Sequence, residues 1–334
     1  MLRSFGSFIP ERTVYSLKKK ISAGIILAGL TAAGIFIFNR IIYYFATIDK
    51  LLNYEDGNYF EWRFGKIFYK KMGEGKPILL IHDLNSHSSG YEWKKAAPLL
   101  AKTNTVYMID LPGCGRSEKP NLTYTNFFFA QMITDFIKGV IGEKTDVIAT
   151  GESASFVITA CHMGDDIIGK VAMVNPASLK ELAKVPTKRT KTLKLLIQTP
   201  LIGSLLYNIL QSRKYIEEAF VTKYYYNPVK TDEHIADIYY ESAHLDHSHS
   251  RFLFGSIKGR YTKMNILHCL KNTNNSIFII SGKGMPEYEN IQEEYRHYIP
   301  AVEPVSLEDT AYLPQLERPE VFCEQIQIFF DDEQ

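Results

Sequence analysis

The stretch that decides the fold spans residues 146–160 and reads DVIATGESASFVITA. It begins with an apolar run, continues through small residues at Gly151, Ser153 and Ser155, and ends in a helical pattern. A strand that turns sharply into a helix, with a serine at the turn and small residues two positions to either side, is a nucleophile elbow. We therefore predict a strand, a turn that presents Ser153, and a helix over 155–163.

Short β-type runs alternate with helical patterns from about residue 58, an order typical of a mostly parallel sheet flanked by helices. The other predicted strands are 77–81, 105–110, 171–175, 276–281 and 302–307, with an antiparallel hairpin within 60–71 and helices over 92–101, 126–140 and 319–330. Between residues 176 and 270 the alternation stops, and prolines break several short helical patterns. We therefore predict an α/β domain in two parts, 58–175 and 271–330, with a helical cap over 176–270.

The N-terminal segment is apolar enough to cross a membrane. Residues 21–39 contain no charged side chain and would span about 28 Å as a helix, close to the thickness of a hydrocarbon core. Lys18–Lys20 precede this run and few basic residues follow it, so the positive-inside rule places the N-terminus in the cytoplasm. We predict a basic cytoplasmic tail over 1–20, a single transmembrane anchor over 21–45 and an extracytoplasmic domain. A cleaved signal peptide and a buried core helix are the alternatives, although a signal-peptide core is usually shorter.

Composition and charge narrow the class of protein. The chain has 38 basic and 37 acidic residues, and its first 20 residues carry a net charge of +4, so the rest is slightly acidic. This distribution gives no support for nucleic-acid binding. The cysteines are widely spaced and the histidines do not form a ligand pattern, so we expect no metal and no cofactor. We expect free thiols. Disulfide bonds are the alternative if the domain lies outside the cytoplasm.

Two further motifs accompany the elbow. Residues 110–117 read DLPGCGRS directly after a predicted strand, and residues 313–322 read LPQLERPEVF near the end of the chain. His82 and Asp83 stand at a strand end before a serine-rich loop. With these motifs the sequence resembles the α/β-hydrolase superfamily over about residues 58–330, especially the branch of haloalkane dehalogenases, epoxide hydrolases and carbon-carbon bond hydrolases.

The resemblance implies positions for the groups that act on the substrate. Ser153 takes the nucleophile position, and the backbone N–H groups of Ala154 and Leu84 take the oxyanion positions. Asp83 stands where the family has the glycine of its His-Gly pair. Dehalogenases and epoxide hydrolases of this branch use an aspartate nucleophile, so a serine disfavours both of these activities.

The acid and base positions depart from the family pattern. Met285 occupies the acid position, an alternative location for the acid near Asn175 also carries no charge, and Tyr312 occupies the base position that the family gives to histidine. A phenol with a pKa of about 10 is deprotonated in roughly one molecule per thousand at pH 7, so it is a poor base. His82, His87 and, in the cap, His244 are the candidate substitutes for the base.

We therefore expect a membrane-anchored pseudo-hydrolase that binds a ligand or serves as a scaffold. The alternative is a serine hydrolase of esters, thioesters or amides that uses Ser153 with a non-standard base. A small apolar molecule or an acyl group is the expected ligand, and no protein partner is indicated.

The cap carries two features whose role the sequence leaves open. The apolar segment 195–210 is expected to line a pocket or to pack on the sheet, with the membrane surface as the alternative. The basic residues just before it are expected to form a solvated face, with contact to anionic lipid as the alternative. These residues are Lys188, Arg189, Lys191 and Lys194.

Overall fold

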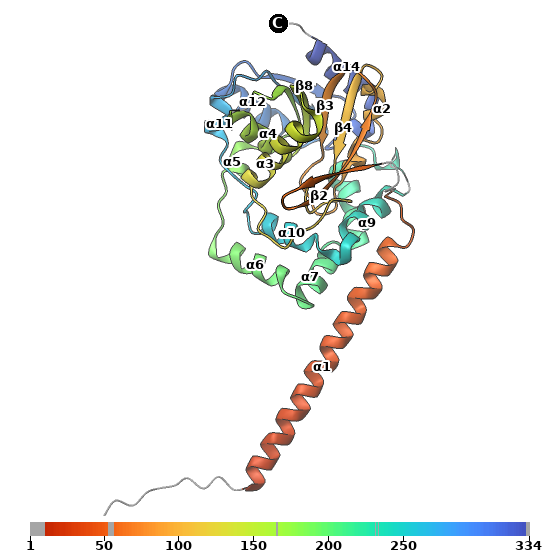
Figure 1. The fold of residues 1–334 in the computed structure, drawn as a ribbon, viewed down its shortest axis with the longest axis vertical. Helices are drawn as coiled ribbons and strands as arrows, with labels where there is room; N and C mark the ends of the chain where they lie inside the picture. Colours follow the sequence, from red (N-terminus) through yellow and green to blue (C-terminus); the bar gives the residue numbers. More distant parts are fainter. Residues whose placement is uncertain (1–10, 53–56, 165, 231, 233, 332–334) are drawn as a thin grey trace, which may run out of the picture.

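A computed structural model describes residues 11–52, 57–164, 166–230, 232 and 234–331. It consists of one long N-terminal helix and an α/β domain with helices on both faces of the sheet (Figure 1). The first ten residues of the predicted cytoplasmic tail lie outside the described residues.

The sheet has eight strands in the order β1-β2-β4-β3-β5-β6-β7-β8. The strands β1 and β2 form an antiparallel hairpin, β2 pairs antiparallel with β4, and all later pairs are parallel. The strands are β1 Asn58–Trp62, β2 Gly65–Met72, β3 Lys76–Ile81, β4 Asn104–Ile109, β5 Thr145–Thr150, β6 Ile168–Val174, β7 Ile277–Gly282 and β8 Glu303–Leu307. The predicted α/β fold class, including its edge hairpin, is therefore confirmed.

The central strands are buried on both faces, because helices cover the sheet on both sides. Alternate residues of one strand enter different cores: Leu79 and Ile81 of β3 pack on one side, and Ile78 and Leu80 on the other. The first core is covered mainly by α3 (Asn126–Phe136), α4 (Ser153–His162), α11 (Leu267–Lys271) and α12 (Tyr288–Tyr298). The second is covered by α2 (Ala97–Leu100), α14 (Pro319–Asp331) and the short helix η1 (Gly90–Trp93). A run such as KPILLI in β3 reads as continuously apolar for this reason.

Helical structure fills the connection between β6 and β7. The helices there are α5 Leu179–Leu182, α6 Lys188–Gln198, α7 Ile202–Leu210, α8 Arg213–Ala219, η3 Phe220–Tyr224, η4 Pro228–Lys230, α9 Ile235–Ser248 and α10 Arg251–Lys258, followed by α11. Tyr224 and Tyr239 of this segment form an aromatic cluster with Tyr312 and Leu313 of the sheet domain. The segment therefore packs over the edge of the sheet where the candidate site lies.

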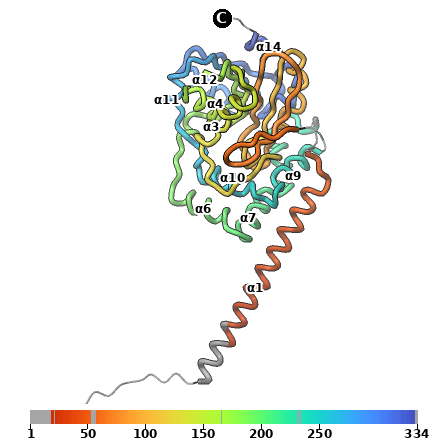
Figure 2. Tube along the Cα trace, in the orientation of Figure 1, coloured from red at the N-terminus to blue at the C-terminus, as the bar shows by residue number. Residues whose placement is uncertain are grey.

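The N-terminal helix α1 (Glu11–Thr47) extends away from the domain in Figures 1 and 2. Its portion Ser22–Thr47 has a mean hydropathy of 2.0 and is long and apolar enough to span a membrane. Side chains such as Ile25, Leu30 and Phe45 are about two-thirds exposed. A helix with this much exposed apolar surface is not the core helix of the domain, which was one of the alternatives.

Candidate active site

The turn between β5 and α4 has its strained residue at Gly151. The Gly151 N–H donates to Val174 O at 2.9 Å, which extends the pairing of β5 with β6 to the last residue before the turn. Gly151 then adopts a left-handed conformation with φ 59°, Glu152 is already right-handed helical, and α4 begins at Ser153. Glycine suits this position because it adopts positive φ at little cost.

Ser153 does not lie at the tip of this turn, contrary to the prediction that the turn presents it. It is the first residue of α4 and its side chain is fully buried. Its Oγ donates a hydrogen bond to the backbone carbonyl of His82 at 2.7 Å. In a nucleophile elbow the serine oxygen is exposed at the top of the sheet, so this hydroxyl has the environment of a structural serine. The helix predicted from 155 begins two residues earlier than expected.

The space above Gly151 is occupied by two side chains from other elements. A Cβ atom added to Gly151 would lie 2.1 Å from Asp83 Oδ1 and 2.2 Å from the hydroxyl oxygen of Tyr312. The side chain that would extend from the tip of the turn thus coincides in space with a carboxylate and a phenol. Both blocking residues are buried.

Asp83 binds the backbone of the turn directly. Its Oδ1 accepts a hydrogen bond from Glu152 N at 3.1 Å, and its own N–H donates to Glu92 Oε2 at 2.7 Å. Burial, followed by the negative charge of Asp83, raises the pKa of Glu92 well above its ordinary value. Two acidic side chains therefore lie one behind the other at the turn, and the nearer one, Asp83, accepts a hydrogen bond from the N–H of the residue after the turn tip.

Tyr312, at the predicted base position, lies in the aromatic cluster with its phenol toward Asp83. Its ring stacks on Tyr224 at 5.7 Å between centroids, and Lys223 Nζ lies 4.0 Å from the ring centroid. Burial raises the pKa of the Tyr312 phenol well above its ordinary value, and the charge of Asp83 and its hydrogen bond with the phenol act in the same direction. At neutral pH this group is therefore a hydrogen-bond donor and not a proton acceptor.

The three histidines considered as substitute bases are engaged elsewhere. His82 bonds the carbonyl of Asp83 through Nδ1 at 2.7 Å and accepts from Leu111 N through Nε2 at 2.9 Å. His87 lies between Gln211 Oε1 and the Tyr224 hydroxyl, each at 2.8 Å.

His244 bonds the carbonyl of Tyr240 at 2.8 Å through Nδ1, four residues before it on α9. Burial lowers the pKa of His87 and of His244 to about 4. In the part of the chain that the structure describes, none of the three imidazoles is hydrogen-bonded to Ser153 Oγ.

The predicted acid position lies beside the base position in one cavity. Met285 and Tyr312 line a pocket of about 210 Å³ at the carboxyl ends of β6 and β7, together with Asn175 and Lys223. Asn175 connects its walls: its amide nitrogen donates to the carbonyls of Ala311 and Tyr312 at 3.0 Å each, and its Oδ1 accepts from Gly282 N. The acid and base positions are thus neighbours, but neither carries a charge.

Of the predicted oxyanion donors, Ala154 lies three residues after the turn tip, and Leu84 directly follows Asp83, whose side chain contacts the turn. Ala154 is the second residue of α4, and its side chain and that of Leu84 are buried in the first core. The backbone N–H that faces the blocked space is that of Glu152. The Glu152 side chain turns away from this space and pairs with Lys263 at 3.2 Å.

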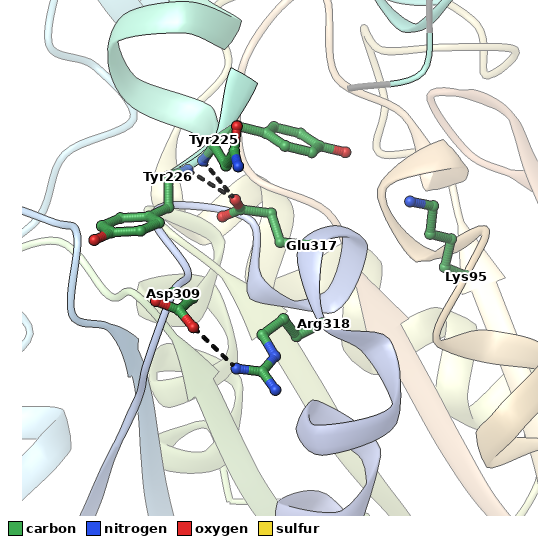
Figure 3. A pocket seen from close by; sticks show the side chains of 7 residues that line it. Lys95, Tyr225, Tyr226, Asp309, Glu317 and Arg318 are labelled. Carbon is green, nitrogen blue, oxygen red and sulfur yellow. Dashed lines mark hydrogen bonds and ion pairs between the residues drawn. The ribbon is translucent and has the colours of Figure 1, made fainter. Parts of the chain in front are cut away.

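A second pocket lies between the cap and the sheet domain, where Tyr225 and Tyr226 face Glu317 and Arg318 (Figure 3). The carboxylate of Glu317 accepts backbone hydrogen bonds from Tyr226 N at 2.7 Å and from Ala311 N at 2.6 Å. It therefore holds the segment just after η3 and the loop that carries Tyr312 together. Neither Ser153 nor Gly151 is among the residues that line this pocket.

Comparison with known proteins identifies the family to which this chain belongs. Residues 78–325 match the sequence profile of the alpha/beta hydrolase family. The chain belongs to the α/β-hydrolase family. An α/β hydrolase places its nucleophile on the turn between a strand and a helix, and in this α/β hydrolase the residue on that turn is Gly151.

Individual relatives match part of the sequence. The chain is 25% identical over 114 residues to 2-hydroxy-6-oxo-6-(2'-aminophenyl)hexa-2,4-dienoic acid hydrolase of Metapseudomonas resinovorans, covering 33% of this chain and 39% of the relative. It is 26% identical over 110 residues to the soluble epoxide hydrolase of Corynebacterium sp. (strain C12), covering 33% and 38%. The chain thus aligns with well under half the length of these curated relatives.

Solved structures extend the likeness in fold to more than four-fifths of the chain. The epoxide hydrolase CorEH superposes with a TM-score of 0.67 at 18% identity, covering 82% of this chain and 98% of that one. A meta-cleavage product hydrolase from Pseudomonas fluorescens IP01, CumD, gives 0.67 at 17% identity, covering 84% and 99%. At these identities the likeness shows the fold alone.

Sequence reasoning missed the role of Gly151, although the signal was present. Gly151, Ser153 and Ser155 fit the pattern of a small residue on each side of a tip, but Ala149, Gly151 and Ser153 fit it equally well. We predicted Ser153 at the tip because, of these two sets of three residues, only the one centred on Ser153 places a serine there. The contact of Asp83 with the turn is carried by tertiary structure and has no local signal.

Proposed function

We propose that this protein is a membrane-anchored member of the α/β-hydrolase family that binds a ligand and does not carry out Ser-His-Asp catalysis. One observation carries the proposal: the residue at the tip of the turn is a glycine, and Asp83 and Tyr312 fill the space that a nucleophile would need. Gly151 then takes the nucleophile position that we predicted for Ser153.

The hydrogen bond from Glu152 N to Asp83 supports this proposal. In the family the N–H of the residue after the nucleophile stabilises the oxyanion, and after Gly151 that residue is Glu152. Here its N–H already bonds a carboxylate oxygen. A developing oxyanion would have to displace this carboxylate or lie beside it, and like charges in a buried site repel strongly.

The state of the base position gives further support. Loss of the base in a triad costs about a millionfold in turnover, and Tyr312 with its raised pKa is protonated at neutral pH. No imidazole among the described residues bonds the Ser153 hydroxyl. These observations support the proposal that no triad forms around Ser153.

The 210 Å³ cavity beside Tyr312 is the site we assign to a ligand. Met285, Pro286 and Ile291 supply apolar walls, and the Lys223 ammonium provides a positive charge at the same cavity. This combination fits a small apolar molecule or a short acyl chain that ends in a carboxylate. Substitution of Met285 by Trp would fill the cavity and should abolish binding of a short-chain fatty acid, measured by calorimetry, whereas Met163→Trp on the surface should not.

A fluorophosphonate probe tests the catalytic part of the proposal. The full-length wild-type chain in detergent should remain unlabelled, while a competent serine hydrolase in the same tube is labelled. Labelling of the wild type that disappears in Ser153→Ala would contradict the proposal. It would support the second candidate, a serine hydrolase of esters, thioesters or amides acting through Ser153, which is favoured by the hydrolase names of its relatives.

We also propose a single-pass topology with the N-terminus in the cytoplasm and the domain outside. The basic residues before the apolar span support this orientation through the positive-inside rule. Protease added to intact cells should then digest the domain. Complete protection of the domain until the membrane is opened would refute the orientation.

A further inference from the structure

The corner between α6 and α7 lies on the side of the domain from which α1 departs (Figure 1). Several apolar side chains of this corner are exposed. The two segments meet at an angle of 105°. Exposed fractions at this corner reach 65% for Leu195, 46% for Leu196, 57% for Ile202 and 59% for Ile209. Several large apolar side chains exposed on two successive helices are typical of an interaction surface.

The anchor helix α1 contacts this corner directly. The corner therefore lies at the same height along the axis of α1 as the residues that it contacts. Asn39 Nδ2 donates to Leu201 O at 3.1 Å, and Asn208 Nδ2 donates to Asn39 Oδ1 at 2.9 Å. One residue further along α1, Arg40 Nη1 bonds His247 Nδ1 at 3.0 Å. These contacts hold α7 and the C-terminal end of α9 against the domain-proximal part of α1.

The length of the span places that level at the edge of the bilayer. The apolar portion Ser22–Thr47 has 26 residues, about 39 Å as a helix, whereas a hydrocarbon core is about 30 Å thick. Some 20 residues cross such a core, so a span that starts at Ser22 ends near Ile41. Asn39 and the corner bonded to it therefore lie at the boundary between hydrocarbon and headgroups.

The charge around the corner favours a lipid surface over a protein partner. Residues 188–212 include four basic residues and no acidic one. Of these, Lys188, Arg189 and Lys191 are exposed, while Lys194 is buried with Nζ 5.1 Å from the Tyr261 ring centroid. An apolar tip with adjacent basic side chains is the pattern of helices that lie in a membrane interface and attract anionic headgroups.

We propose that the α6–α7 corner inserts into the interface of the membrane that holds α1, with phospholipid as its occupant. The domain is then attached at two points, which fixes its orientation above the bilayer. This inference rests on the proposed anchoring by α1. The apolar segment 195–210 thus takes the membrane-surface role that the sequence left as the alternative.

Depth-dependent quenching in lipid vesicles tests the inference on the full chain. Single cysteines at Ile202, Ile328 and Leu30 carry an NBD fluorophore, and the wild-type chain, taken through the same labelling, gives the background from the native cysteines. Ile328 is the matched control, because it is an isoleucine of similar exposure, 61%, on α14 at the far end of the domain. Leu30 reports the span itself. The vesicles contain nitroxide-labelled phosphatidylcholine with phosphatidylglycerol.

Quenching at Ile202 is expected to exceed that at Ile328 at least about threefold, since interfacial helices place their apolar face at the boundary with the acyl chains. Equal quenching at Ile202 and Ile328, with Leu30 strongly quenched, would overturn the inference and leave the anchor intact. Weak quenching at Leu30 would instead contradict the anchor. A fluorophore at Ile202 that reports an apolar environment without lipid quenching would show that protein covers the corner, and would also overturn the inference.

Discussion

Gly151→Ala should destabilise the protein more than an alanine at a comparable glycine elsewhere. The new Cβ would lie about 2 Å from Asp83 Oδ1 and from the Tyr312 hydroxyl, well inside van der Waals contact. Positive φ costs an alanine about 1–2 kcal/mol, and forcing apart packed side chains costs a further 1–3 kcal/mol or so. We expect a total loss of about 3 kcal/mol in the free energy of unfolding.

Gly142 provides the control for the backbone contribution. It also has positive φ, 79°, but a Cβ added there meets no atom within 4 Å. Gly142→Ala should therefore cost only the conformational part, about 1–2 kcal/mol. The difference between the two substitutions measures the crowding at the tip of the turn.

Removal of the two blocking groups should relieve that crowding. In an Asp83→Gly, Tyr312→Phe background, Gly151→Ala is expected to cost no more than Gly142→Ala, which corresponds to a coupling of about 2 kcal/mol between the sites. Urea unfolding of the detergent-solubilised full chain, followed by circular dichroism, gives all the required free energies. A Gly151→Ala cost equal to that of Gly142→Ala in the wild-type background would refute the reasoning that the tip is occupied.

Three further outcomes follow from polar groups that are buried or half-buried. The unfolded chain protonates His87 and His244 below about pH 6.5 while the folded chain, with pKa values of about 4, does not, so stability is complete above pH 6.5 and falls as the pH drops toward 4. At pH 5 each imidazole should account for about 2 kcal/mol, and unfolding curves at pH 7 and pH 5 should show a smaller difference in His87→Gln and His244→Gln. The pKa of Glu92 is raised in the folded chain, so the tendency of this carboxyl to ionise destabilises the fold as the pH rises. Glu92→Gln should therefore raise the melting temperature at pH 8 and leave it unchanged at pH 4. An equal change of the melting temperature at both pH values would contradict this cause. Glu317→Gln should cost about 2 kcal/mol because one of the backbone N–H donors at the carboxylate would then face an amide N–H group, and limited proteolysis should detect a looser cap.

Much of the fold was accessible from local patterns. The strands in the sheet centre are short apolar runs bounded by turn signals, and the predicted strand over 302–307 differs from the observed β8 by only one residue. The uncharged run after Lys20 predicted a helix that the structure shows as exposed and apolar. Periodicity and length carry such information because each element buries its own apolar face.

The candidate site was less accessible, because its residues come together from separate elements. Tyr312 and Met285 were found through the family pattern, and they line one cavity. The occupation of the turn by Asp83 could not be predicted, since it depends on where the loop after β3 places that side chain. The engagement of His87 by Gln211 and Tyr224, more than 100 residues away, is equally non-local.

The sequence by itself determined that this protein has an α/β sheet, an inserted helical segment and one apolar helix of membrane-spanning length. Only the tertiary structure decided which small residue forms the tip of the central turn. Ala149, Gly151, Ser153 and Ser155 alternate with the same spacing, so local chemistry allows the turn to centre on Gly151 or Ser153. Pairing of β5 with β6 continues through Gly151 N, and α4 starts at Ser153. The packing of strand and helix therefore selects the glycine, because it is the residue that can take positive φ where no room remains for a side chain.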